Sequence, residues 1–363
     1  MNWLSKFFNR IKTKLFGKIV LETSEQESKD AEVVTEKQEP IVEILGKLEV
    51  EEERDPYFIQ IGLDFGTSYT KCVCRDINTD KAWVHIPNRT YVQELPFLIP
   101  SSLVIKNNEI FRVKDGNVCY PQGGIYNLKH ALSAVAKGNL EDLTLVPYKS
   151  AVRLKKTDQL PALVATCAVY LLAGILGEIR KEIRSRFKGF GSNPFDYMAV
   201  NLAIPVEDAE YSTIRKVFLK VLGESWELAD ELCSYPRIHL NELVSLRKEI
   251  RTTKTRSFGE ACFVYPEVSA NVQGFVRSRV SSPGIYLFND TGGGTVDQSI
   301  FIFSRDGYTD SLAYLSGRVL ALGSGKIEEK AAEKSGKKDA PSLEKERKRG
   351  NTSGIGRGEG ENI

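Results

Sequence analysis

The chain has 363 residues, of which 41% are hydrophobic and 27% are charged, so it can bury a sizeable core and is long enough for two domains. Its net charge of +2 favours no polyanionic partner, and we expect it not to bind nucleic acid. The six cysteines lack CxxC spacing and are predicted to be reduced thiols, while the three histidines lie far apart in the sequence, which argues against a histidine-built metal site.

Residues 1–20 are predicted to form a basic amphipathic helix. Apolar residues recur there at spacings of three and four, which places them on one helical face: Leu4, Phe7, Phe8, Ile11, Leu15 and Ile19. The segment also carries five basic residues and no acidic one. Such a helix is typical of one that lies at a membrane surface instead of spanning it. Docking on a protein partner or on the rest of the chain is an alternative, and so is an organellar targeting peptide. We expect a cytoplasmic protein, peripheral at the membrane if this helix meets lipid.

Residues 21–56 are predicted to form an acidic flexible linker. From Glu22 to Asp55 the sequence has 13 acidic residues against four basic ones, a net charge of −9, and no aromatic residue. High charge without aromatic residues favours disorder, and like charges keep such a segment extended. The linker would separate the basic helix from the folded part.

The folded part is predicted to begin with strands. Tyr57–Asp64 and Tyr69–Arg75 flank a short glycine turn, and this pattern predicts a β-hairpin. Three more short strands are expected after it: Ala82–Pro87, Ser102–Ile105 and Glu109–Val113.

Helices and one buried strand follow. Leu160–Arg186 has apolar residues stepping by three and four, which predicts a long helix that ends before a glycine-rich stretch. Tyr197–Ile204 is predicted to be a buried strand, and the apolar spacing from Ala209 to Leu222 predicts a second helix. The basic stretch Leu243–Arg256 has no aromatic residues between its charges for stacking on bases. We therefore expect a solvated helix or loop face there.

Two glycine turns, each next to an aspartate and each leaving a strand, are the main functional signal. The first is Asp64–Thr70 and the second is Asp290–Asp297. Glycine lets backbone N–H groups approach a phosphate closely, and the successive amides of a turn form an anion-binding nest. An aspartate beside a phosphate is explained if a hydrated Mg²⁺ lies between the two. The pair of turns therefore predicts a nucleotide held between two lobes.

At these residues the chain resembles the superfamily of actin, sugar kinases and DnaK-type heat-shock chaperones, and the chaperone branch most of all. Asp64–Tyr69 is similar to the chaperones' phosphate-1 loop, and Asp290–Asp297 is similar to their phosphate-2 loop. Val264–Val272 is similar in position to the connect-1 helix, although the proline precedes the glutamate here. Val200–Val206 and the helix after it match the family's strand, Val-Pro turn and helix.

The resemblance implies an α/β protein with an actin-like (ribonuclease H-like) ATPase fold, in which the first lobe is complete and the second lobe is partial. We expect the first lobe at residues 57–280, the partial second lobe at residues 281–330, and a charged, glycine-rich flexible tail at residues 331–363. The family's adenosine loop and peptide-binding domain find no counterpart in the sequence after the second turn.

The resemblance also implies a site for ATP and Mg²⁺. Asp64 and Asp290 would hold the metal through water, and Glu267 would position the attacking water. Lys114 is the candidate for a first-lobe lysine at the γ-phosphate. The other expected nucleotide contacts come from the two turns: Gly66, Thr67, Ser68 and Tyr69 from the first, and Gly292, Gly293, Gly294, Thr295 and Asp297 from the second.

We therefore expect a chaperone-like nucleotide-binding ATPase domain that binds Mg-ATP, and that hydrolyses it if a second lobe is supplied. Its nucleotide state would switch the angle between two lobes. One alternative is a non-catalytic, membrane-associated interaction protein or a truncated fragment that retains the fold. Another is a small-molecule kinase of the same superfamily, although the sequence shows no motif for an acceptor-activating aspartate or a sugar pocket.

Overall fold

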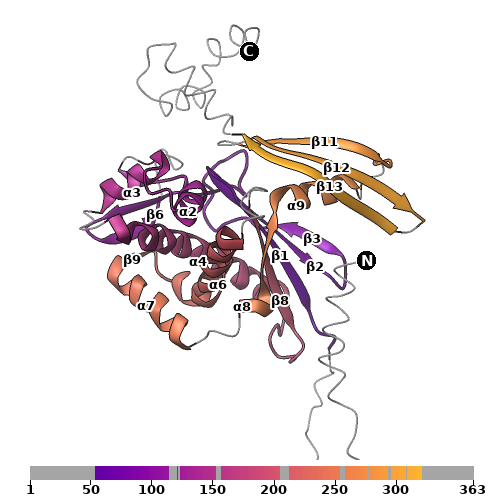
Figure 1. Ribbon diagram of the computed structural model, residues 1–363. Coiled ribbons are helices and arrows are strands. Elements are labelled where there is room, and N and C mark those ends of the chain that lie inside the picture. Colours follow the sequence, from indigo (N-terminus) through magenta and orange to yellow (C-terminus); the bar gives the residue numbers. More distant parts are fainter. Residues whose placement is uncertain are drawn as a thin grey trace, which may run out of the picture. The chain divides into compact units, whose positions relative to one another are not determined.

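The structure, a computed structural model, describes residues 54–320 except 114–120, 122, 153–156, 205–211, 254–257, 277, 279, 293–295 and 308 (Figure 1). The chain divides into two compact units, Met1–Glu53 and Arg54–Ile363, and all described residues belong to the second. The predicted basic helix at residues 1–20, most of the predicted linker and the predicted tail at residues 331–363 lie outside the described residues.

The main sheet confirms the predicted hairpin and the predicted buried strand. Its strands pair in the order β10-β8-β1-β2-β3, and β4 pairs with β2. β1 runs antiparallel to β2 but parallel to β8, which in turn runs parallel to β10. The strands span Phe58–Phe65 (β1), Tyr69–Asp76 (β2), Lys81–Val84 (β3), Ile99–Pro100 (β4), Tyr197–Ile204 (β8) and Cys262–Pro266 (β10). β3 is shorter than expected, because the chain leaves the sheet after Val84.

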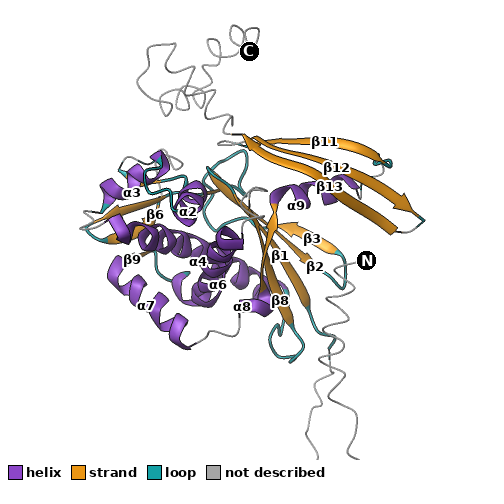
Figure 2. Cartoon of the chain, in the orientation of Figure 1, coloured by secondary structure: helices purple, strands orange, loops and turns teal. Residues whose placement is uncertain are grey.

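Helices α4 (Leu160–Arg186) and α6 (Ser212–Leu232) pack against the main sheet (Figure 2). α4 has the predicted bounds, and α6 continues past the predicted end at Leu222. Alternate residues of β1, beginning with Ile59 and ending with Phe65, lie in the same buried cluster as these helices. α4 is long and apolar enough to cross a membrane, but most of its apolar stretch is buried inside the fold, as in the core helix of a soluble protein. Its composition is explained by this packing.

A second, smaller sheet has the strand order β7-β5-β6-β9. Its strands span Leu103–Lys106 (β5), Glu109–Arg112 (β6), Gly124–Ile125 (β7) and Arg237–His239 (β9). The helices of this part and of the segment after it are α2 (Leu128–Ala136), η2 (Leu143–Leu145), α3 (Val146–Ala151), η3 (Thr157–Gln159), α7 (Leu240–Thr253) and α8 (Phe258–Ala261).

The basic stretch expected to be a solvated face is helix α7, and one of its arginines is buried. The Arg247 Nε donates to an oxygen of Glu224, a fully buried carboxylate on α6, at 2.7 Å. Arg251 donates to the other oxygen of this carboxylate at 2.6 Å. The expectation was wrong for Arg247, because an acid on another helix supplies its counter-charge, whereas Arg251 is exposed as expected.

A third sheet, with strand order β11-β12-β13, follows helix α9 (Glu267–Val276). Its strands span Gly284–Thr291 (β11), Val296–Asp306 (β12) and Thr309–Leu320 (β13). Val272 and Val276 of α9 form a small buried cluster with Phe301 and Phe303 of β12. Along β11, half-buried residues that face this cluster alternate with exposed residues on the other face of the sheet. Ile285 is one of the exposed residues. The sheet is therefore covered by α9 on one face.

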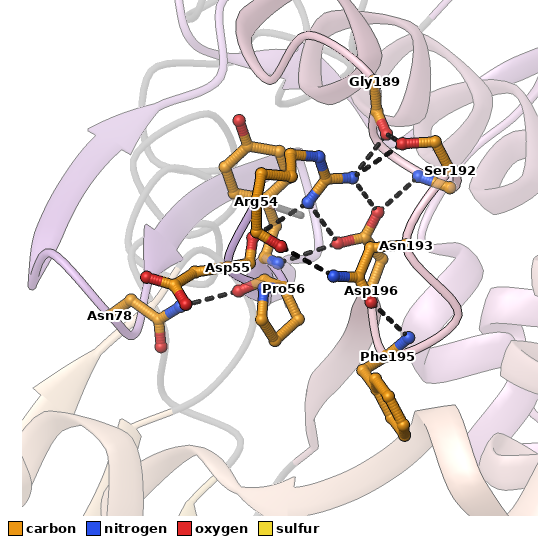
Figure 3. Close-up of polar contacts among 11 residues, drawn as sticks. Arg54, Asp55, Pro56, Asn78, Gly189, Ser192, Asn193, Phe195 and Asp196 are labelled. Atoms are coloured by element: carbon orange, nitrogen blue, oxygen red, sulfur yellow. Dashed lines mark hydrogen bonds and ion pairs between the residues drawn. The ribbon is translucent and has the colours of Figure 1, made fainter. Parts of the chain in front are cut away.

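The beginning of β1 is fixed by a polar cluster around Asp196, the residue before β8 (Figure 3). The Arg54 guanidinium donates to both carboxylate oxygens of Asp196. The backbone N–H groups of Tyr57 and Gly191 donate to the same carboxylate at 2.8 and 2.6 Å. Asn193 donates from its side chain to the Arg54 carbonyl at 2.8 Å. This cluster joins the starts of two neighbouring parallel strands.

Candidate functional site

The first glycine turn connects β1 to β2 through residues 66–68. A Cβ placed on Gly66 would lie 2.3 Å from the Tyr69 carbonyl oxygen, so the turn has room for no other residue without moving its backbone. Outside the turn, the Ser101 N–H donates to the Ser68 carbonyl oxygen at 2.9 Å, and the hydroxyl groups of Thr70 and Ser101 lie 2.9 Å apart. The predicted phosphate-1 residues thus sit on a tight, braced turn.

Asp64, at the carboxyl end of β1, has a lysine partner that the sequence analysis did not anticipate. Lys71 is its register partner on β2, and the Lys71 Nζ lies 3.0 Å from the Asp64 Oδ2. The two side chains are 47% and 42% exposed, so this ion pair lies at the surface. The register explains the pair: Phe65 pairs with Thr70 across the four residues 66–69, so Asp64 lies opposite Lys71.

Asp64 and Glu267 both lie at the carboxyl edge of the main sheet. Because β1, β8 and β10 are parallel, their carboxyl ends meet at one edge of the sheet. Asp64 pairs in register with Ala203, and Ala203 pairs with Tyr265, so Asp64 and Tyr265 lie two strands apart in one row. This corresponds to a Cα separation of about 10 Å at ordinary strand spacing. Glu267 follows directly as the first residue of α9.

Glu267 meets a buried lysine from another part of the chain. The Lys129 Nζ, on α2, donates to the Glu267 Oε1, and the two side chains are only 5% and 16% exposed. A charge buried to this extent needs a partner, and each of these groups supplies it for the other. Lys114, the predicted lysine, lies outside the described residues. Lys129 is thus a lysine partner of Glu267 that the sequence analysis did not single out. The sequence feature that could have indicated this role is that Lys129 is a lysine among apolar residues at the start of helix α2.

The second glycine turn connects β11 to β12. Gly292 is described, whereas Gly293, Gly294 and Thr295 lie outside the described residues, so the predicted cradle of amides stays a prediction. Asp290 and Asp297 are register partners on the two strands. They share the face that carries the small cluster with α9, and Asp297 is buried.

The two aspartates of the second turn are of the residue type through which Mg²⁺ is commonly bound together with a substrate phosphate. Side chains directly opposite each other on antiparallel strands have Cβ atoms about 5 Å apart, and like charges in such a pair destabilise it unless a cation lies close by. Among the described residues, no group of three or more histidines, cysteines, aspartates or glutamates could hold a metal ion. Mg²⁺ needs no such group, because it is usually bound through one or two carboxylates, waters and substrate phosphates.

The structure arranges the predicted residues in three local groups: Asp64 with the first turn, Glu267 with Lys129, and Asp290 with Asp297. The first two groups share one edge of the main sheet. Carboxyl edges of parallel strands, where the strand order changes direction, are the usual place of ligand sites in α/β sheets. Here the direction changes at β1, which leads to β2 on one side and to β8 on the other.

No model of a known protein family matches the chain, and no curated protein matches it significantly.

Proposed function

We propose that this chain is a nucleotide-binding ATPase domain of the actin-like (ribonuclease H-like) fold, closest to the DnaK-type chaperones, and that it binds Mg-ATP. The observation that carries the proposal is the placement of Asp64 and Glu267 at one carboxyl edge of the main sheet, with Lys129 beside Glu267. Residues 203 positions apart in the sequence lie at the same sheet edge there, in an arrangement suited to a polyphosphate. A strand hairpin followed by parallel strands and long helices supports the fold part of the proposal.

In this proposal the protein acts on the phosphates by position and charge, because phosphoryl transfer needs little covalent help. The backbone amides of Gly66, Thr67 and Ser68 bind phosphate oxygens. Lys129 neutralises charge on the terminal phosphate and fixes the Glu267 carboxylate. Glu267 then orients the water that attacks the phosphorus and accepts its proton.

Asp64 and the pair formed by Asp290 and Asp297 would hold Mg²⁺ through its water molecules. The ion supplies charge neutralisation of the phosphate oxygens when it is bound. Tyr69 follows the first turn directly, and Gly292 begins the second, so both lie where the expected nucleotide contacts would be made.

The proposal is tested by calorimetric titration of the full chain with Mg-ATP. We expect binding by the wild type and a loss of at least about tenfold in affinity for Asp64→Asn. Asp80→Asn is the matched control, because Asp80 lies in the turn between β2 and β3 and forms an exposed ion pair with Arg75. A folded, monodisperse wild type that binds no nucleotide would refute the proposal. Glu267→Gln should bind ATP but hydrolyse it more slowly than the wild type.

A second candidate function, a non-catalytic interaction protein, is favoured by the exposed face of the third sheet. Ile285 and Leu287 of β11 are 70% and 61% exposed, and Leu315 of β13 is also exposed. Exposed apolar surface on a sheet often marks a site of protein interaction. ATP binding without measurable turnover, together with self-association or partner capture through this face, would favour this function.

A further inference from the structure

We propose that Lys71 is a built-in counter-ion for Asp64 and that it makes nucleotide binding at the first turn only weakly dependent on Mg²⁺. This inference rests on the proposed function, because it concerns the same site. Its starting observation is that the carboxylate expected to hold the metal already has an ammonium group 3.0 Å away.

The backbone determines the position of Lys71. Lys71 lies opposite Asp64 in the ladder between β1 and β2, next to the last register pair before the turn, Phe65 with Thr70. The residues on either side of Lys71, Thr70 and Cys72, are buried on the opposite face of β2 and hold that strand in place. The lysine stem therefore begins beside the turn whether or not a ligand is bound.

The electrostatic consequence concerns the approach of a polyphosphate. A carboxylate at the mouth of a phosphate-binding turn repels the ligand, and a divalent cation normally removes this repulsion. An ammonium group at hydrogen-bonding distance removes much of it without metal. Lys129 does the same for Glu267. Two of the predicted site carboxylates thus carry lysine counter-ions, and the metal ion is not the sole source of positive charge in the site.

Because Asp64 and Lys71 are both exposed, their ion pair contributes little to the free energy of folding. Ion pairs between exposed side chains contribute about 0–1 kcal/mol to folding, since water screens them and ordering two long side chains costs entropy. Replacing Lys71 should leave the fold intact, so an effect on binding can be read directly.

The experiment titrates the full chain with ATP in Mg²⁺ and again in EDTA. We expect the wild-type dissociation constants in the two buffers to agree within about tenfold. Lys71→Met should weaken binding in EDTA by about 10- to 100-fold and change binding in Mg²⁺ by less than about threefold, because the metal then neutralises Asp64. Arg75→Met is the matched control: Arg75 lies on the same face of β2 but pairs with Asp80, and its replacement should leave both dissociation constants unchanged.

The outcomes separate this inference from the proposed function. Wild-type binding in Mg²⁺ that is lost in EDTA would overturn the inference and leave the proposed function standing. Equal weakening of Lys71→Met in both buffers would also overturn it, because Lys71 would then contact the nucleotide itself. If the folded wild type binds ATP in neither buffer, the proposed function fails and the inference fails with it.

Discussion

Removing the carboxylate of Asp196 should destabilise the domain by about 2 kcal/mol at neutral pH. Asp196 is 2% exposed, and its side chain accepts hydrogen bonds from the Arg54 guanidinium and from the backbone N–H groups of Tyr57 and Gly191 (Figure 3). The hydrogen bond with Arg54 is the largest cause that lowers the pKa of Asp196 from 3.8 to about 2. A lowering of this size corresponds to about 2 kcal/mol of folding free energy above pH 5.

The sign of the pH dependence follows from the direction of this pKa change. The folded state favours the ionised carboxylate, so the stabilisation is fully present above the unfolded pKa near 4 and is lost as the pH falls through about 2. We expect the free-energy difference between the wild type and Asp196→Asn to fall to about half of its neutral value by pH 3.

Urea unfolding followed by circular dichroism at pH 7, 5, 4 and 3 measures this difference. Asp80→Asn is the control, because Asp80 forms an exposed ion pair with Arg75 and should change stability by less than about 0.5 kcal/mol. The reasoning is refuted if Asp196→Asn costs no more than the control, or if its cost is the same at pH 3 as at pH 7.

Four further substitutions have expected outcomes in the same unfolding assay. Lys129→Met should cost about 3–5 kcal/mol, because it leaves a buried carboxylate without its cation; a double variant that also neutralises the glutamate should cost less. Arg247→Met should likewise cost about 3–5 kcal/mol, since Glu224 is fully buried, and a cost below 1 kcal/mol would show that the remaining arginine suffices. Gly66→Ala should cost about 1–3 kcal/mol through its clash, whereas Gly274→Ala, in open space on a helix, should stabilise by about 0.5–1 kcal/mol.

The elements that could be predicted from the sequence are those with a strong local pattern. Leu160–Arg186 has the bounds that its apolar spacing predicts, and the strands on either side of Gly66 form the predicted hairpin. β13 shows the opposite case, because most of its residues are exposed and show no clear apolar alternation. The spacing of apolar residues in a sequence reflects which residues are buried. It therefore predicts a strand poorly where few of the strand's residues are buried.

The site could be predicted only in the parts that turn chemistry determines. Glycine and aspartate at strand ends pointed to Asp64 and Asp290, and both lie at the ends of strands that lead into such turns. The pairing of Lys129 with Glu267 was not predicted. The two residues are 138 positions apart, and the local spacing of residues in a sequence does not show which distant residues come together. Arg247 was missed for the same reason.

Two buried ion pairs in this domain have the same chemistry but different positions, and the positions separate a structural pair from a candidate site. Arg247 and Glu224 lie between α6 and α7, where Arg247 also donates to the Thr166 hydroxyl of α4, so this pair holds three helices together. Glu267, with Lys129 as its partner, lies instead at the carboxyl edge of parallel strands, the same edge at which β1 ends in Asp64 and the first glycine turn. In the proposed function Lys129 would neutralise charge on a phosphate while it fixes Glu267, a use that helix packing alone would not give such a pair.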